Sequence, residues 1–201
     1  TLANGKVYRY VGKRNGDYLP ISILVAPQRK QMISFSGDYT FKGIIFRGNL
    51  SLSDYNRNLF SSLDKKDDKG LATQIDIEKP FLVKKWKITP GIHYVGIQES
   101  FTAIENFQTQ EFARDWNIGS SQKLQQYYIH PQLKLAKSVK QNIIYDFERL
   151  LIPANKNYLG DRQAINIDWN EKRWRVKNRT SVLNSKSDEK SSSFTRHDAL
   201  M

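Results

Sequence analysis

A series of strand-like runs separated by turn residues limits the folds that this chain can adopt. Residues 6–11 alternate between polar and apolar side chains, and residues 19–25 are mostly apolar and partly β-branched. Alternation with period two is typical of a strand with one buried face, and Asn15-Gly16 between the two runs favours a hairpin turn. Similar runs follow at 31–35, 39–46, 73–77, 81–88 and 92–97. We therefore expect a mostly antiparallel sheet in the first half of the chain.

The turns between these runs are predicted from glycine and proline. Gly37 favours a turn at 36–38, and Pro90-Gly91 favours another at 89–91. A charged stretch at 64–70 predicts a surface loop.

The second half of the chain suggests helices. Pro131 suits the first position of a helix and Pro153 would stop one, so 131–152 is predicted to be a long amphipathic helix. Shorter helices are expected at 102–116 and from 120 or 121 to 128, and a hairpin at 164–177 turned at 170–172. The apolar stripe of the long helix is formed, at steps of four, by Leu135, Val139, Ile143, Phe147 and Leu151.

These elements predict an α+β fold. The expected architecture is a mostly antiparallel β-sheet with two or three helices inserted after residue 100 and an extended C-terminal tail. One domain would occupy 1–179, and the polar, serine-rich segment 180–201 would be the tail.

The charge of the chain indicates an acidic partner. The formal net charge is +12 over 201 residues, and ten of the excess positive charges lie in 1–60 and 162–180. If these two regions met in space, they would form one basic face of the kind that attracts phosphate. The nucleic-acid-binding residues predicted on this basis are Lys13, Arg14, Arg173, Arg175, Lys177 and Arg179.

Catalytic and metal-binding patterns are missing. The chain has no cysteine, which excludes disulfides and thiolate zinc sites, and its three histidines are far apart with no metal-ligand spacing. We expect no catalytic residues, no metal and no cofactor. One weak alternative is a metal-dependent nuclease that would use Asp161, Asp168 and Glu171 beside Lys172.

The sequence-based hypothesis is a non-enzymatic structural component of a large nucleoprotein assembly, with a virion protein of the phage connector or tail type as the leading example. Such a protein would be a homo-oligomer that contacts neighbouring subunits and possibly nucleic acid, in a virion or the cytoplasm, with no membrane, signal peptide or transmembrane segment. The alternative is a free-standing DNA- or RNA-binding protein, including the nuclease above. The subunit contact is assigned to Leu135, Val139, Ile143 and Phe147 on the predicted helix.

Overall fold

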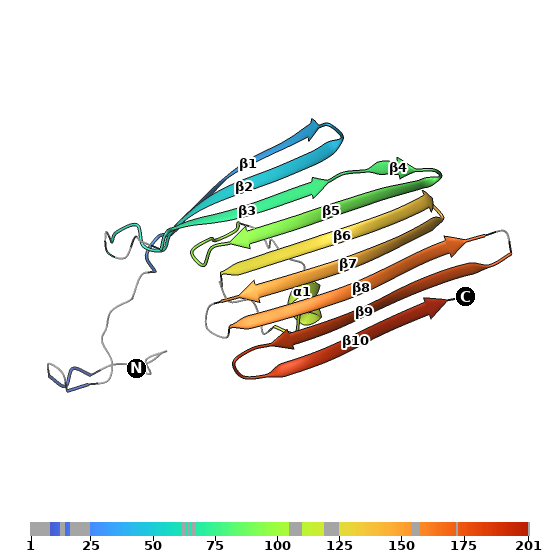
Figure 1. Cartoon of the computed structure of the whole chain (residues 1–201). Helices are drawn as coiled ribbons and strands as arrows, with labels where there is room; N and C mark the ends of the chain where they lie inside the picture. Colours follow the sequence, from blue (N-terminus) through green and yellow to red (C-terminus); the bar gives the residue numbers. More distant parts are fainter. Residues whose placement is uncertain are drawn as a thin grey trace, which may run out of the picture.

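The structure is a single antiparallel sheet of ten strands in which neighbours in sequence are mostly neighbours in space (Figure 1). It is a computed structural model, and it describes residues 9–12, 15–16, 25–61, 63, 65, 67–104, 110–118, 125–153, 157–171 and 173–200. The strand order is β1-β2-β3-β5-β6-β7-β8-β9-β10, with the short β4 paired to β5. The elements are β1 Arg29–Phe41, β2 Ile44–Asn56, β3 Lys69–Glu78, β4 Phe81–Val83, β5 Trp86–Ile97, α1 Gln110–Asp115, β6 Gln126–Ser138, β7 Gln141–Ile152, β8 Tyr158–Asn170, β9 Arg175–Lys186 and β10 Ser191–Leu200.

The predicted α+β class is therefore wrong, and the sheet continues through the second half of the chain. The expected helix 131–152 is the hairpin of β6 and β7, which turns at Val139 and Lys140. A step of four is also a multiple of two, so Leu135, Ile143 and Phe147 satisfy the period of a strand as well as that of a helix. The polar residues Asn142 and Asp146 stand where a helix would need apolar side chains three positions further along.

The other predicted helices fare differently along the connection between β5 and β6. Of 102–116, only Gln110–Asp115 is helical, and residues 105–109 lie outside the described part. Residues 126–128, the end of the second expected helix, begin β6. No helix among the described residues has the length and apolarity needed to cross a membrane.

The predicted C-terminal tail is also wrong, because its residues are strands. β9 crosses the expected boundary at 179 and 180, and β10 pairs with it from Ser191↔Lys186 to Leu200↔Lys177. Backbone hydrogen bonds to a neighbouring strand order this polar segment without requiring apolar side chains. The predicted hairpin at 164–177 is confirmed as part of the β8–β9 pair.

The predicted turns at 36–38 and 89–91 lie inside strands. Gly37 pairs with Gly48 in the middle of the β1–β2 hairpin, and Pro90 pairs with Leu133 within β5 and β6. The β1–β2 turn occurs instead at Lys42 and Gly43, which both have positive φ angles, of 48° and 76°. Two positive φ angles are the geometry of the tight hairpin turn that matches strand twist.

A small core lies on one side of the sheet, below α1. Trp116 is 1% exposed and packs with Leu150, Tyr158 and Leu183, while the hydroxyl of Tyr158 donates a hydrogen bond to the carbonyl oxygen of Trp116. Gly160 makes this approach possible, since a Cβ there would lie 3.0 Å from the Trp116 ring. The connection that holds α1 therefore covers part of one sheet face only.

Gly70 fixes where this connection begins. An added Cβ at Gly70 would lie 2.2 Å from backbone atoms of Phe101, much closer than van der Waals contact allows. Nearby, the backbone N–H of Thr102 donates to the hydroxyl of Ser53 at 3.0 Å. Gly48, by contrast, has no atom within 4 Å of the corresponding position.

We predict that Gly70→Ala lowers the free energy of unfolding by about 1–3 kcal/mol, because the backbone at Phe101 must move. The matched control Gly48→Ala should change it by less than about 0.5 kcal/mol. Urea denaturation followed by circular dichroism measures both values. Equal effects of the two substitutions would contradict the close packing at Gly70.

Candidate functional site

The most distinctive chemical feature of the sheet is the contrast between its two faces. Residues that pair directly across two strands point to the same face, and the face alternates along each strand. Following the registers from β1 to β8, nearly all large apolar strand side chains fall on one face, which we call the apolar face. It includes Ile33, Phe35, Phe46, Leu50, Leu52, Ile75, Ile77, Ile88, Ile92, Ile129, Leu133, Leu135, Ile143, Phe147, Ile165 and Ile167.

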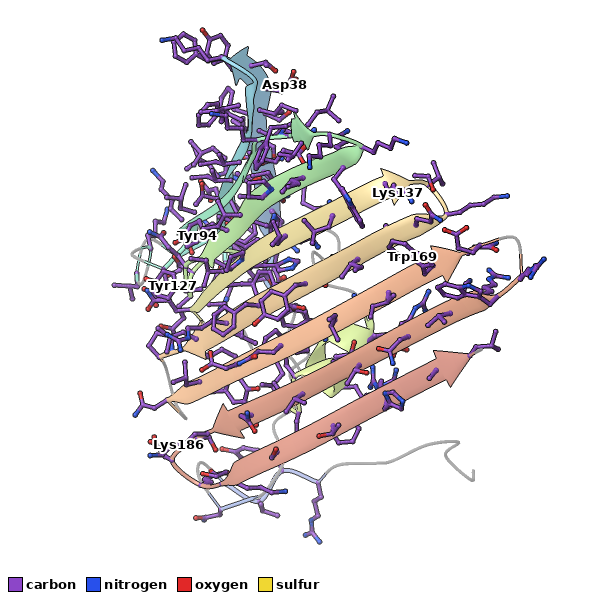
Figure 2. The ribbon with its side chains drawn as sticks, turned by 45° about the vertical axis from the view of Figure 1, so that its right-hand side comes forward. Asp38, Tyr94, Tyr127, Lys137, Trp169 and Lys186 are labelled. Carbon is purple, nitrogen blue, oxygen red and sulfur yellow. The ribbon has the colours of Figure 1, made fainter. Side chains whose placement is uncertain are left out.

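The apolar face is open over its whole extent among the described residues. Phe35 is 61% exposed at the β1 edge, and Leu133 in the central strand β6 is still 38% exposed. Side chains in the middle of a two-layer domain are usually buried by a second sheet or a helix. Here α1 lies on the opposite face (Figures 1 and 2), so the central side chains touch only their neighbours in the same sheet.

The opposite face, which we call the polar face, holds a buried hydrogen-bond cluster around Asp146. The Asp146 carboxylate is 6% exposed and accepts hydrogen bonds from Gln132 and from Asn166, the latter at 3.1 Å. His130 Nε2 lies 2.9 Å from the same carboxylate. Several donors satisfy the oxygens of a buried carboxylate, which would otherwise be costly to remove from water.

A second cluster on the polar face joins Glu148, Arg162 and Tyr128 below Trp116. The Arg162 guanidinium donates to both Glu148 oxygens at 2.7 Å and lies 5.3 Å from the centre of the Trp116 ring. The Tyr128 hydroxyl donates to Glu148 at 2.8 Å. Burial, followed by the negative charge of Glu148, raises the pKa of Tyr128 well above its ordinary value. Tyr128 is therefore a fixed hydrogen-bond donor and not a proton-transfer group.

Two histidines pair across β5 and β6 on the same face. His93 is opposite His130, and its Nδ1 lies 2.6 Å from Asp76. The carboxylate of each His–Asp pair comes from a neighbouring strand, which is why sequence spacing gave no signal for it. No group of three or more histidines, cysteines or acids able to hold a metal occurs in the part of the chain that the structure describes.

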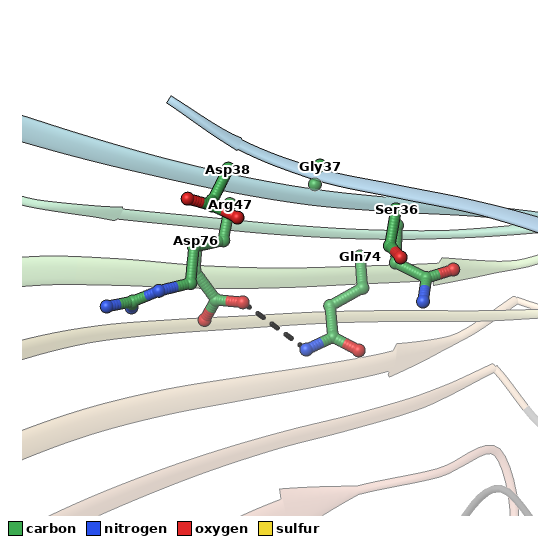
Figure 3. Close-up of a pocket in the computed structure, with 8 residues that line it drawn as sticks. Ser36, Gly37, Asp38, Arg47, Gln74 and Asp76 are labelled. Carbon is green, nitrogen blue, oxygen red and sulfur yellow. Dashed lines mark hydrogen bonds between the residues drawn. The ribbon is translucent and has the colours of Figure 1, made fainter. Parts of the chain in front are cut away.

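A shallow polar hollow lies beside Asp76, on β1, β2 and β3. Figure 3 shows Ser36, Asp38, Arg47 and Gln74 lining it, with the Gln74 amide donating to Asp76 at 3.3 Å. The Arg47 side chain donates to Glu78 at 2.8 Å. Mixed charges in an open hollow give no preference for one class of ligand.

The structure places the predicted nucleic-acid-binding residues in different situations. Arg175, Lys177 and Arg179 do share the polar face of β9, as their alternation suggested, although Lys177 lies 4.0 Å from Asp168. Arg173 is in the β8–β9 turn, and Lys13 and Arg14 lie outside the described residues. Residues 29–56 form one edge of the sheet and 175–186 lie near the other, so these parts of the two basic regions do not meet.

The residues predicted as a subunit contact separate into two groups. Leu135, Ile143 and Phe147 lie on the apolar face, in adjacent strands, while Val139 is in the β6–β7 turn and is 94% exposed. Their common surface is a sheet face and not a helix stripe. The sequence did contain a signal for that face, since 127–135 and 143–151 are apolar at most odd-numbered positions.

The acids of the proposed nuclease do not come together. Asp161 and Asp168 are seven residues apart in β8, and an odd separation in a strand puts two side chains on opposite faces. Asp161 accepts two hydrogen bonds from Arg149, which raise the pKa of that guanidinium, and Glu171 accepts one from Gln141 at 2.7 Å. Lys172 lies outside the described residues.

Comparison with known proteins supplies no relative on which to base a function. The chain matches no protein-family description, no curated protein and no solved structure at a significant level. The two faces of the sheet are thus the observations on which a functional proposal depends.

The buried ion pair on the polar face should be important for stability. Glu148→Gln leaves the Arg162 charge without its partner below Trp116, and we expect a loss of about 2 kcal/mol in the free energy of unfolding. Glu78→Gln is the matched control, since its partner Arg47 is 54% exposed and exposed pairs contribute less than about 1 kcal/mol. Thermal and urea denaturation would contradict this if the control lost as much stability as Glu148→Gln.

Proposed function

We propose that this protein is a non-enzymatic structural component of a larger assembly, in which the apolar face of the sheet is covered. One observation supports this most directly, namely the size of that face. Its apolar part extends about 27 Å along β6, from Tyr127 to Leu135, at about 3.4 Å per residue. It also extends about 29 Å across the six spacings from β1 to β8, at about 4.8 Å each.

These dimensions correspond to about 800 Å², which exceeds the few hundred Å² of contiguous apolar surface that a soluble monomer usually exposes. An open face of this size lowers its free energy by leaving water, so a protein or lipid surface is expected to cover it. Two features that supported an assembly role in the sequence, the helix at 131–152 and the tail, are strands. The proposal therefore depends on the apolar face alone.

The sheet edges are a second feature that suits an assembly protein. β1 and β10 each pair on one side only among the described strands, and β1 is exposed along its whole length. An unpaired edge offers backbone donors and acceptors to a further strand. Pairing at these edges would extend the sheet and cover no part of either face, so it is compatible with coverage of the apolar face.

We predict that the full chain, in buffer without detergent, elutes as complexes larger than its mass of 23.4 kDa. Phe35→Glu places a charge on the apolar face of β1 and should reduce association about tenfold. Ser36→Glu, the next residue and on the polar face, is the matched control and should not. Light scattering after size exclusion, with nuclease-treated lysate, measures the mass. A dispersed wild-type monomer would overturn the proposal.

Nucleic-acid binding is the second candidate function. It is favoured by the shared position of Arg175, Lys177 and Arg179 on the polar face of β9, where side chains of one face can follow a phosphate backbone. The structure gives it less support than an assembly role, since Lys177 already neighbours Asp168.

Replacing Arg175, Lys177 and Arg179 by Gln should flatten the salt dependence of nucleic-acid binding by about three charges, at about 0.9 in slope per phosphate contact. Filter binding at a series of salt concentrations gives this slope. An unchanged slope would show that these residues do not contact phosphate, and no measurable binding by the wild-type chain would exclude this candidate.

A further inference from the structure

The outline of the apolar face indicates what covers it. One row of paired residues on this face passes through Ile75, Tyr94 and Ile129 and then reaches Arg149 and Asp161. A parallel row nearer the other end of the strands stays apolar as far as β8, through Ile88, Leu135, Ile143 and Ile167. The apolar part is therefore a band that crosses the strands obliquely, as expected for tilted strands that meet an apolar layer.

The length of this band fits the hydrocarbon interior of a bilayer. On β6 the apolar part, Tyr127–Leu135, covers nine residues of the strand. A strand tilted by about 45° needs about 9–11 residues to traverse a hydrocarbon layer of about 30 Å.

Aromatic residues that carry a polar group lie at both margins of the band. Trp86 and Trp169 lie near one margin, with ring centres 5.9 Å apart, and Tyr94 and Tyr127 lie towards the other. Figure 2 shows Trp169 and the two tyrosines towards opposite ends of the strands. The indole N–H and the phenol hydroxyl need water or headgroup partners, so these residues suit the boundary between hydrocarbon and water.

A row of cations lies beyond the Trp margin, at the end of the sheet with the short turns. We call this row the basic rim. All its residues are exposed, and within the described part of the chain none has an ion-pair partner. It consists of Lys42, Lys84, Lys85, Lys137, Lys140 and Arg173.

We propose that lipid acyl chains of a bilayer cover the apolar face, with the basic rim at a layer of anionic headgroups. This inference rests on the proposed assembly role and names what covers the face. Lysines can extend along apolar surface to keep their charge at a headgroup, which attracts them when it is anionic. In hydrocarbon an edge strand cannot leave backbone groups unpaired, so β1 and β10 pair with further strands when the face is in lipid.

A second protein layer fits these observations less well than lipid. Such a layer would pack about 10 Å from the sheet and would bury the marginal indole and phenol groups together with the Arg149–Asp161 pair. It would also give no reason for a row of unpaired cations beside one margin only. A lipid layer accounts for the oblique outline, the two aromatic margins and the basic rim with one physical environment.

The absence of cysteine allows this proposal to be tested one side chain at a time. Leu133→Cys places a label on the apolar face of β6, and Lys134→Cys places one at the next position, on the polar face. Each full-length variant is labelled with an environment-sensitive fluorophore and added to vesicles of phosphatidylethanolamine with phosphatidylglycerol. We expect a quencher attached to the acyl chains to quench the label at 133 at least threefold more than the label at 134. We expect aqueous iodide to show the reverse order.

The possible outcomes separate this inference from the assembly role. If the label at 133 is protected from iodide in a protein complex without vesicles, and acyl-chain quenchers do not reach it, the lipid proposal fails and the assembly role stands. If the label at 133 is open to iodide with and without vesicles, both fail. Equal lipid quenching at 133 and 134 would also overturn the proposal, because it would contradict a one-sided face.

A second pair of variants tests the basic rim without disturbing the sheet. Lys84→Gln with Lys85→Gln, in the β4–β5 turn, should lower binding to vesicles that contain phosphatidylglycerol at least threefold and weaken its salt dependence. Lys65→Gln with Lys69→Gln, near the opposite end of the sheet, removes the same charge and should have less than half that effect. Equal effects of the two pairs would show that net charge alone, and not the position of the rim, attracts the protein.

Discussion

Antiparallel backbone pairing in a continuous register is the constraint on which the rest of this structure depends. Each strand from β1 to β10 is held by ladders to its neighbours, and the few residues that are both apolar and buried are grouped largely around Trp116 and Phe101. Most of the sheet therefore has no second layer to fix its position. Register alone decides which side chains share a face, because a shift of one residue would move every side chain of a strand to the other side.

That register separates two kinds of chemistry. The polar face collects charged side chains from strands that are distant in sequence, and each buried charge finds a partner, as Glu148 does with Arg162 and Tyr128. The apolar face has few such groups, and the Arg149–Asp161 pair lies where its band ends. A sheet with one solvated face and one apolar face is stable only if something removes the apolar face from water. The assembly role and the lipid layer proposed above are both consequences of this requirement.

The connection between β5 and β6 modifies this picture at one place. It lies over β3 at Gly70, where only a glycine leaves room for the backbone of Phe101, and it carries Trp116 onto Gly160. The Trp116 ring then covers the Glu148–Arg162 pair and shields part of the polar face from water. Asp115 and Asn117 extend the contact to β10 through Arg196 and Ser192, so α1 links the centre of the sheet to its last strand. The polar face is thus partly covered by the chain itself, whereas the apolar face is not.

Much of the local structure could be predicted from the sequence, and the errors have physical causes. Strands in the first half and the hairpin at 164–177 follow from period-two alternation and turn residues, which act over a few positions. The helix at 131–152 was wrong because residues spaced by four fit both periods, and the strands at 181–200 were missed because polar residues are ordered there by backbone pairing to β8 and β9. Turns at Gly37 and Pro90 were wrong because both residues also fit inside these long strands.

The sequence by itself determined the alternation along each strand, the basic charge and the absence of cysteine, since these are properties of single residues and short intervals. Only the tertiary structure decided that the apolar positions of seven strands form one band, and that Asp146 meets His130 and Asn166. Only the structure separated Asp161 from Asp168 and the basic residues of β1 and β2 from those of β9. The physical reason is that registers between strands far apart in sequence are set by backbone pairing and by the connections between strands. No local pattern of residues records them.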